Sequence, residues 1–126
     1  MKNSKFYICP HCKNLVEMVH DAGVKPVCCG QKMDELVPNT VDASGEKHIP
    51  AVTVSDGIVE VNVGSVDHPM LPEHWIQWVL VETDKGFHRH DLHPAEAPEA
   101  VFTLPGEKVI AVYEYCNLHG LWKTSL

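Results

Sequence analysis

The chain has 126 residues, a hydrophobic content of 44% and ten basic against seventeen acidic side chains, which give a net charge of −7 at pH 7. A chain of this length buries one modest core, or a small core plus a metal-stapled unit. The acidic balance argues against a nucleic-acid partner, because such a partner needs a basic face. No apolar run approaches the ~20 residues of a membrane span. The N-terminal stretch lacks an apolar signal-peptide core, so we expect a cytoplasmic location without membrane association.

The unusual feature of the composition is its five cysteines and nine histidines. Without an export signal, thiols in a reducing compartment are more often metal ligands or redox groups than structural disulfides. An odd number of cysteines also cannot pair completely within one chain. Metal ligation is therefore the leading hypothesis before any spacing is considered.

The first 37 residues contain four of the cysteines and too few large apolar residues for a core of their own, so a metal is expected to hold them together. Cys9 and Cys12 form a CxxC turn, and the adjacent pair Cys28 and Cys29 follows after fifteen intervening residues. Four thiolates give a tetrahedral site that suits zinc or iron. Two neighbouring cysteines on one ion predict a wider S–metal–S angle. His11, inside the turn, is expected to face solvent.

Two alternatives remain open for this cysteine cluster. The first is a zinc site that only staples the fold, because zinc accepts a distorted tetrahedron. The second is a redox disulfide between Cys9 and Cys12. That disulfide is less favoured, since no thioredoxin-like βαβ pattern surrounds the two cysteines.

From residue 38 onward the pattern is that of short β-strands. Residues 58–63 alternate three valines with polar residues, as in a half-buried strand. Short strands without an amphipathic helix between them indicate an antiparallel sandwich or barrel. The expected fold is mainly β, with a small metal-binding domain at 1–37 and a β-sandwich at 38–126. Strands are expected at 49–54, 58–63, 75–83, 87–92, 100–104 and 109–115.

A second candidate metal site combines the fifth cysteine with histidines from separate segments. Cys116 and His119 form a CxxH turn, which is a local chelate in the way that CxxC is. His68 and His74 flank one proline-containing loop, and His48 immediately precedes the strand expected from residue 49. If these segments meet at one end of the sandwich, one ion gains four imidazoles and one thiolate.

Five protein ligands fit a square pyramid with four nitrogens in the plane and sulfur on the axis, and they leave the sixth position open. This set differs from a structural zinc site, which closes at four ligands. A thiolate opposite the open position donates electron density into it, as in thiolate-ligated haem enzymes. The set therefore indicates iron that reacts with a small oxygen species. Four histidines do not fit this set: His88 and His90, expected as a surface pair on one strand face, and His20 and His93.

Together these motifs resemble desulfoferrodoxin, the two-iron class of superoxide reductase, over essentially the whole chain. The resemblance implies a desulforedoxin-like iron domain at 1–37 and an immunoglobulin-like sandwich at 38–126. It is carried by CPHC at 9–12, Cys28-Cys29, Glu46-Lys47-His48, His68-Pro69-Met70, His74, Ile76-Gln77-Trp78 and Cys116-Asn117-Leu118-His119-Gly120-Leu121-Trp122.

The resemblance also implies cofactors, ligands and partners. Members of this class reduce superoxide by one electron to hydrogen peroxide, draw electrons from rubredoxin or a similar donor, and are usually homodimers. Two non-haem irons are implied. The first is implied to be held by Cys9, Cys12, Cys28 and Cys29. The second, catalytic iron is implied to have four equatorial histidines and an axial cysteine: His48, His68, His74, His119 and Cys116.

Two further residues receive roles from the resemblance. Lys47 is the candidate for attracting the superoxide anion and for organising the water that delivers protons. Glu46 is the candidate sixth ligand of the oxidised iron. Spacing alone would favour a solvated pair on a loop for both residues. The competing functions are a non-catalytic iron- or zinc-binding electron-carrier module and a non-haem iron oxygenase, whose usual site has two histidines and one carboxylate.

Overall fold

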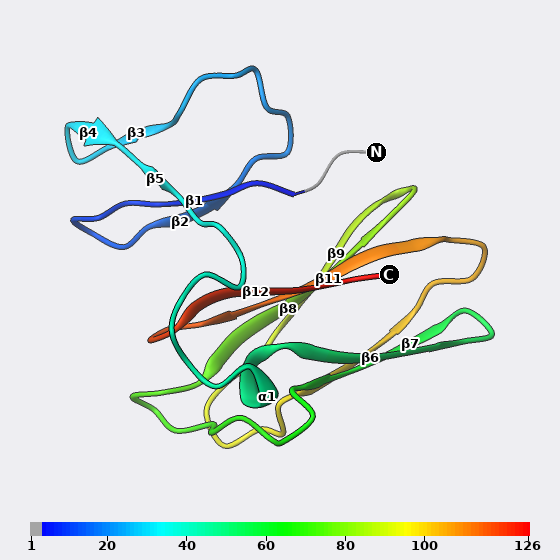
Figure 1. Ribbon diagram of the computed structural model, residues 1–126. Coiled ribbons are helices and arrows are strands. Elements are labelled where there is room, and N and C mark those ends of the chain that lie inside the picture. Colours follow the sequence, from blue (N-terminus) through cyan, green and yellow to red (C-terminus); the bar gives the residue numbers. More distant parts are fainter. Residues whose placement is uncertain (1–3) are drawn as a thin grey trace. The chain divides into compact units, whose positions relative to one another are not determined.

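The computed structural model describes residues 4–126 and shows two compact units that divide between Val37 and Pro38 (Figure 1). Each unit contains its own β-sheets. Across the described residues, no helix combines the length and the apolar character needed to cross a lipid bilayer.

The first unit consists of short strands around a very small core. β1 is the centre of an antiparallel sheet in the order β2-β1-β5, and β3 pairs with β4 separately. Its core cluster consists of Tyr7, Cys9 and Met33, with Val16 and Met18 half-buried beside it. A core of this size needs further stabilisation, such as a bound metal. The strands are β1 Phe6–Ile8, β2 Leu15–Glu17, β3 Val27–Cys28, β4 Gln31–Lys32 and β5 Asp34–Glu35.

The second unit is a sandwich of two antiparallel sheets. One sheet has the strand order β10-β7-β6 and the other has the order β12-β11-β8-β9. Asp56 and Gly57 connect β6 to β7, and both have positive φ, as the Asp-Gly sequence favours in a two-residue hairpin. The strands are β6 Pro50–Ser55, β7 Ile58–Val63, β8 Ile76–Thr83, β9 Gly86–Asp91, β10 Glu99–Thr103, β11 Val109–Cys116 and β12 Gly120–Ser125.

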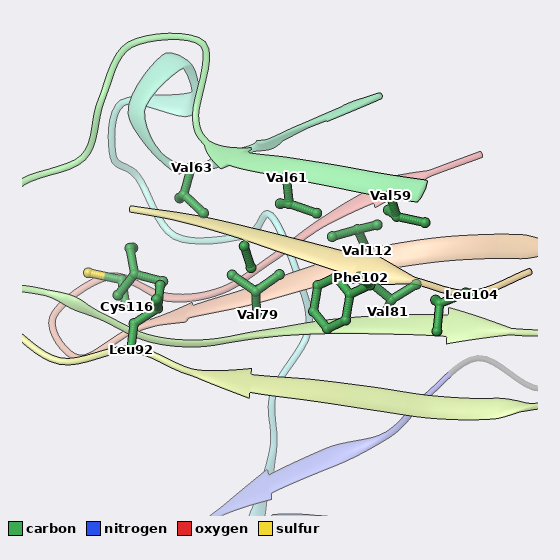
Figure 2. Packing of buried hydrophobic residues seen from close by; sticks show 12 residues of the cluster. Val59, Val61, Val63, Val79, Val81, Leu92, Phe102, Leu104, Val112 and Cys116 are labelled. Atoms are coloured by element: carbon green, nitrogen blue, oxygen red, sulfur yellow. The ribbon is translucent and has the colours of Figure 1, made fainter. Parts of the chain in front are cut away.

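Valines at alternate positions of a strand form much of the sandwich core. Val59, Val61 and Val63 of β7 are buried in one cluster with residues of β8 and β11. Figure 2 shows Val63 and Cys116 at one end of this packed layer and Leu104 at the other. The hydrophobic core therefore ends, on one side, at the sulfur of Cys116.

The predicted fold class is confirmed: the chain is mainly β, with a small cysteine-bearing unit ahead of an immunoglobulin-like sandwich. In the second unit, the structure adds two elements that the sequence pattern does not reveal; the five short strands of the first unit were not predicted either. Gly45–His48 form a single-turn helix, α1, which is too short to produce a helical hydrophobic period. β12 pairs with β11 from the register position Cys116↔Gly120 onward, so it begins directly after His119, the last residue of the CxxH motif.

A carboxylate at the other end of β11 makes the stability of the sandwich depend on pH. Glu107 is half-buried in the β10–β11 loop, and it accepts hydrogen bonds from the Thr83 hydroxyl at 2.6 Å and from Nε2 of His88 at 2.9 Å. These bonds, Thr83 first, lower the pKa of Glu107 from its ordinary value of 4.5. Because the folded pKa is the lower one, this stabilisation is present above the unfolded pKa and is lost as pH falls through the folded pKa.

We expect Glu107→Gln to lower the midpoint of thermal unfolding by a few degrees at pH 7. The deficit relative to the wild type should shrink as the pH falls through the lowered pKa of the folded protein, because the native carboxyl is then protonated as well. Glu99→Gln removes an exposed carboxylate of β10 and is the control, with a small deficit at every pH. Calorimetry over this pH range measures the difference. A deficit that stays constant with pH would contradict the role of the ionised Glu107.

Candidate metal centres

Five side chains from three separated segments converge at the Cys116 end of the sandwich core. Each offers one ligand atom, and all five atoms lie within 4.8 Å of one another. His74 and His119 are partly exposed whereas the other three are buried, so solvent approaches this group on the side of those two histidines. The members of this five-ligand group are His48, His68, His74, Cys116 and His119.

The ends of strands position each segment. His48 is the last residue of α1 and stands just before β6. Cys116 is the last residue of β11, and His119 lies in the turn to β12. His68 and His74 belong to the loop between β7 and β8. The sandwich thus brings together residues that lie as far apart in the sequence as positions 48 and 119.

The loop after β7 packs directly on α1 at a glycine. A Cβ at Gly64 would lie 2.6 Å from the carbonyl oxygen of Glu46, so any side chain there would force a backbone shift. The same carbonyl accepts hydrogen bonds from the Val66 N–H at 3.0 Å and from the Ser65 hydroxyl at 3.2 Å. These contacts tie the loop that contains His68 to α1.

Backbone carbonyls fix the protonation of two of the histidines. Nδ1 of His48 lies 2.7 Å from the Ser44 carbonyl oxygen, and Nδ1 of His68 lies 2.6 Å from that of Pro69. A carbonyl only accepts hydrogen bonds, so both Nδ1 atoms bear a hydrogen and both Nε2 atoms present a lone pair in the neutral ring. Burial lowers the pKa of His48 and lowers that of His68 to about 4, which keeps both rings neutral at pH 7.

The separation of these nitrogens fits a shared cation. Nε2 of His48 lies 3.1 Å from Nε2 of His68 and 3.1 Å from Nδ1 of His119. Two unprotonated nitrogens at this distance repel each other unless a positive ion accepts both lone pairs. Nε2 of His74 is buried and has no hydrogen-bond partner among the residues that the structure describes. The donor set of this group therefore fits a metal ion.

The thiol of Cys116 completes the group. Its sulfur lies 3.5 Å from Nε2 of His68 and 3.9 Å from Nδ1 of His119. Burial raises the pKa of this thiol, because the charged form is poorly solvated there. A thiolate at this position needs a neighbouring positive charge, which a bound metal supplies. Metal binding is therefore expected to release the thiol proton.

Trp122 supports this group directly, although the sequence assigns it no role. Its ring stacks on His48 with centroids 4.9 Å apart and an interplanar angle of 25°. Its Nε1–H donates to the carbonyl of His119 at 3.1 Å. The one feature of the sequence that could have indicated this role is the position of Trp122 three residues after His119.

The four cysteines of the first unit form a second compact group, with their sulfurs within 4.8 Å of one another. Four sulfurs about 2.3 Å from one ion, at tetrahedral corners, would be about 3.8 Å apart. The observed separation is 3.6 Å between Cys12 and Cys28 and 4.0 Å between the adjacent Cys28 and Cys29. Both separations lie close to the tetrahedral value, so these sulfurs are placed to share one ion. This four-cysteine group consists of Cys9, Cys12, Cys28 and Cys29.

Crowding of the four thiols makes their ionisation depend on a cation. The Cys12 N–H donates to the sulfur of Cys9 at 3.4 Å and is the main reason that the pKa of the Cys9 thiol falls to about 6. Neighbouring sulfurs, Cys12 first, raise the pKa of Cys29 to about 12. Four thiolates therefore coexist here only around a positive ion. Asn14, which the sequence does not single out, donates from Nδ2 to the sulfur of Cys28 at 3.6 Å.

Two charged residues, Glu46 and Lys47, stand beside the five-ligand group. Both are exposed on α1, directly before His48. The positive charge of Lys47 is the smallest of the causes that lower the pKa of His48, after burial and the charges of His119 and His74. Lys47 therefore adds a positive potential at the group.

The histidines outside the two groups have other surroundings. His11 is exposed, as predicted. His88 is bonded to Glu107, whereas the ring of His90 packs edge-on against Phe102 with centroids 6.3 Å apart. The two β9 histidines thus have different partners: Glu107 in the β10–β11 loop for His88, and Phe102 of β10 for His90.

Comparison with known proteins identifies the family. The family model described as Desulfoferrodoxin matches residues 40–125. The chain belongs to the desulfoferrodoxin family. The desulfoferrodoxin of Nitratidesulfovibrio vulgaris is 44% identical over 119 residues, which cover 94% of each chain. The superoxide reductase of Pyrococcus abyssi is 35% identical over 104 residues, or 68% of this chain and 90% of that one. The crystal structure of the superoxide reductase from Treponema pallidum has a TM-score of 0.82 and 40% identity, and the match covers 98% of this chain and all of that one.

In this member of the family, the four-cysteine group and the five-ligand group are able to hold two iron ions. Family membership favours iron over the zinc staple for the four-cysteine group, a choice that the sulfur geometry alone leaves open. The five-ligand group offers one more ligand than a structural zinc site uses, because structural zinc is bound by four ligands.

Proposed function

We propose that this protein is a superoxide reductase. The reaction combines one superoxide, one electron and two protons into one hydrogen peroxide, and it forms no dioxygen. The observation that carries the proposal is the five-ligand group, whose ligand atoms all lie within 4.8 Å of one another. Iron bound at this group supplies the electron. The 40% identity to a protein described as the superoxide reductase of Treponema pallidum supports the same activity.

We assign nine metal ligands and two domain roles. Residues 1–37 would be a desulforedoxin-like iron domain, and residues 38–126 would be the catalytic domain. The carbonyls of Ser44 and Pro69 would orient two of the catalytic ligands, as carbonyl partners of metal-bound histidines commonly do. The first iron is assigned to Cys9, Cys12, Cys28 and Cys29. The catalytic iron is assigned to His48, His68, His74, Cys116 and His119.

Lys47 is assigned to guiding the substrate. The chain has a net charge of −7, so the protein as a whole repels a small anion such as superoxide. A local positive charge beside His48 offsets this repulsion where the substrate reacts, and its ammonium group donates hydrogen bonds to the water that supplies protons. The neighbouring carboxylate, Glu46, is assigned as a ligand of the oxidised iron once the product has left.

Lys47→Ala should slow the second-order reaction with superoxide by about 10-fold at low ionic strength, while both irons stay bound. The deficit should shrink as salt is added, because the Debye length is only about 10 Å at 0.1 M. Lys108→Ala changes the net charge equally but lies at the opposite end of β11 from Cys116, so its rate should stay close to that of the wild type. Stopped-flow kinetics at several salt concentrations measures this. Unchanged kinetics in Lys47→Ala would remove Lys47 from the mechanism.

Mixing the reduced protein with superoxide tests the function itself. We expect one hydrogen peroxide for each superoxide consumed and no dioxygen. Dioxygen at half the amount of superoxide would indicate dismutation instead and would overturn the proposal. Metal analysis adds an independent criterion: two irons per chain, each with a ferric–thiolate absorption band, are expected. One zinc and no visible colour would contradict the reductase.

The iron must regain an electron after each turnover, so the proposal includes a donor. We infer a rubredoxin-like electron donor and a homodimeric assembly from the family alone. The alternative of a non-catalytic electron-carrier module accounts for the four-cysteine group equally well. It gives no role to the five-ligand group, which is why the reductase is preferred.

A further inference from the structure

We propose that Asn117 is a positioning residue that holds His74 in place within the five-ligand group. The inference rests on the proposed function, because it takes His74 as a ligand of the catalytic iron. Asn117 is not itself a ligand in this proposal. It acts on the metal only through the backbone that bears His74.

The side-chain amide of Asn117 pairs with the backbone on both sides of His74. Its Nδ2 donates to the Glu73 carbonyl at 3.0 Å, and its Oδ1 accepts from the Trp75 N–H at 3.0 Å. The backbone N–H of Asn117 also donates to the Trp75 carbonyl at 3.3 Å. These three bonds join the turn that follows Cys116 to the segment that bears His74.

His74 lacks the ring hydrogen bond that orients two of the other ligands, so its position depends on the backbone that bears it. Hydrogen bonds from Nδ1 to carbonyl oxygens orient the rings of His48 and His68. The ring of His74, in contrast, makes no hydrogen bond to a carbonyl among the described residues, and its Nε2 is buried without a partner. The backbone of His74 bonds to Leu71 in both directions, but Leu71 belongs to the same loop. That bridge closes the loop on itself. The Met70 carbonyl also accepts from the Ala95 N–H at 2.9 Å, but the bonds from Asn117 are those that reach the residues on either side of His74.

A second asparagine makes the same kind of contact at a site that holds no ligand-bearing loop. Nδ2 of Asn39 donates to the Lys123 carbonyl at 3.0 Å, and its Oδ1 accepts from the Lys123 N–H at 2.8 Å. Lys123 lies inside β12, which its ladder with β11 also holds in place. Asn39→Ala therefore removes two amide–backbone hydrogen bonds from the same sandwich without freeing a ligand. It is the matched control for Asn117→Ala.

The experiment compares the wild type, Asn117→Ala, Asn39→Ala, His74→Ala and the double variant Asn117→Ala/His74→Ala as iron-loaded full chains. Each is mixed with an excess of an iron chelator, and loss of the catalytic iron is followed by its absorption band and by metal analysis. The iron of the four-cysteine group serves as the internal reference. Removing a partner that orients a metal ligand typically costs 10- to 100-fold in metal affinity.

We expect Asn117→Ala to release the catalytic iron about 10- to 100-fold faster than the wild type, and Asn39→Ala to stay within about 2-fold. Because Asn117 acts through His74, the double variant should release iron no faster than His74→Ala alone. If Asn117→Ala does not fold, Asn117→Asp takes its place. It has the same shape but replaces the donor to Glu73 with an oxygen, and faster release is again expected.

Two outcomes overturn the positioning role alone. The first is release at the wild-type rate from the Asn117 variant. The second is a double variant that loses iron much faster than His74→Ala, which would place the action of Asn117 elsewhere. Release at the wild-type rate from His74→Ala has a different meaning. It would overturn the ligand assignment in the proposed function, and the positioning role with it.

Discussion

Replacing Cys116 by serine should slow the reaction with superoxide by roughly 100-fold or more and remove one of the two ferric–thiolate absorption bands. Loss of an orienting partner alone costs 10- to 100-fold at a metal site, and loss of a ligand exceeds that. The sulfur is fully buried at the end of the sandwich core, 3.5 Å from Nε2 of His68. Serine keeps the size of the side chain but not the electron-rich thiolate.

The reciprocal variant provides the control. Cys12→Ser alters the exposed edge of the four-cysteine group, so it should change the other absorption band and leave the first reaction with superoxide nearly unaffected. Stopped-flow kinetics and visible spectra of both variants measure the two effects separately. Full activity in Cys116→Ser would remove the thiolate from the chemistry and, with it, the proposed role of the five-ligand group.

Replacing Cys9 by serine should unfold the first unit while the sandwich stays folded. The core of this unit is the cluster of Tyr7, Cys9 and Met33, and Cys9 is both a core residue and a proposed ligand. Such a core supplies little stability. Structural metal sites of this type contribute about 10 kcal/mol or more to folding at pH 7. The free energy of folding that is lost with the metal therefore exceeds the stability that the small apolar core supplies.

Hydrogen exchange read by NMR resolves the two units in one sample. The amides that pair β1 with β2 and β5 should lose their protection in Cys9→Ser, whereas those that pair β8 with β11 should keep it. In Cys116→Ser, the amides of the first unit should keep their full protection from hydrogen exchange. Retained protection of β1 in Cys9→Ser would mean that the small apolar cluster suffices without the metal.

Local spacing made much of this protein predictable. Cys9 and Cys12 on one turn, and Cys116 and His119 on another, are chelates whatever the surrounding fold. The alternation of Val59 with its neighbours likewise indicated a half-buried strand, and the structure confirms it. Such signals depend only on residues that are close in the sequence, so they can be recognised without knowledge of the tertiary structure.

The supporting contacts were not predictable in the same way. Carbonyls of Ser44 and Pro69 bond to the ligand histidines, but every residue has a carbonyl, so no sequence signal marks these two. The stacking of Trp122 on His48 joins residues that are distant in the sequence. The four residues of α1 make about one helical turn, which is too short for a helical hydrophobic pattern to show in the sequence. These features arise from tertiary packing, which the order of residue types does not encode locally.

The wide sequence separation of the catalytic ligands has a consequence for the order of assembly. His48, His68 and Cys116 come together only when both sheets have paired, and contacts between distant residues form late in folding. The sandwich has a larger apolar core than the first unit, so we expect its ligands to be assembled before iron binds. The cysteines of the first unit must instead capture their ion while that unit folds. We therefore expect the two irons to bind by opposite routes, one after folding and one as part of it.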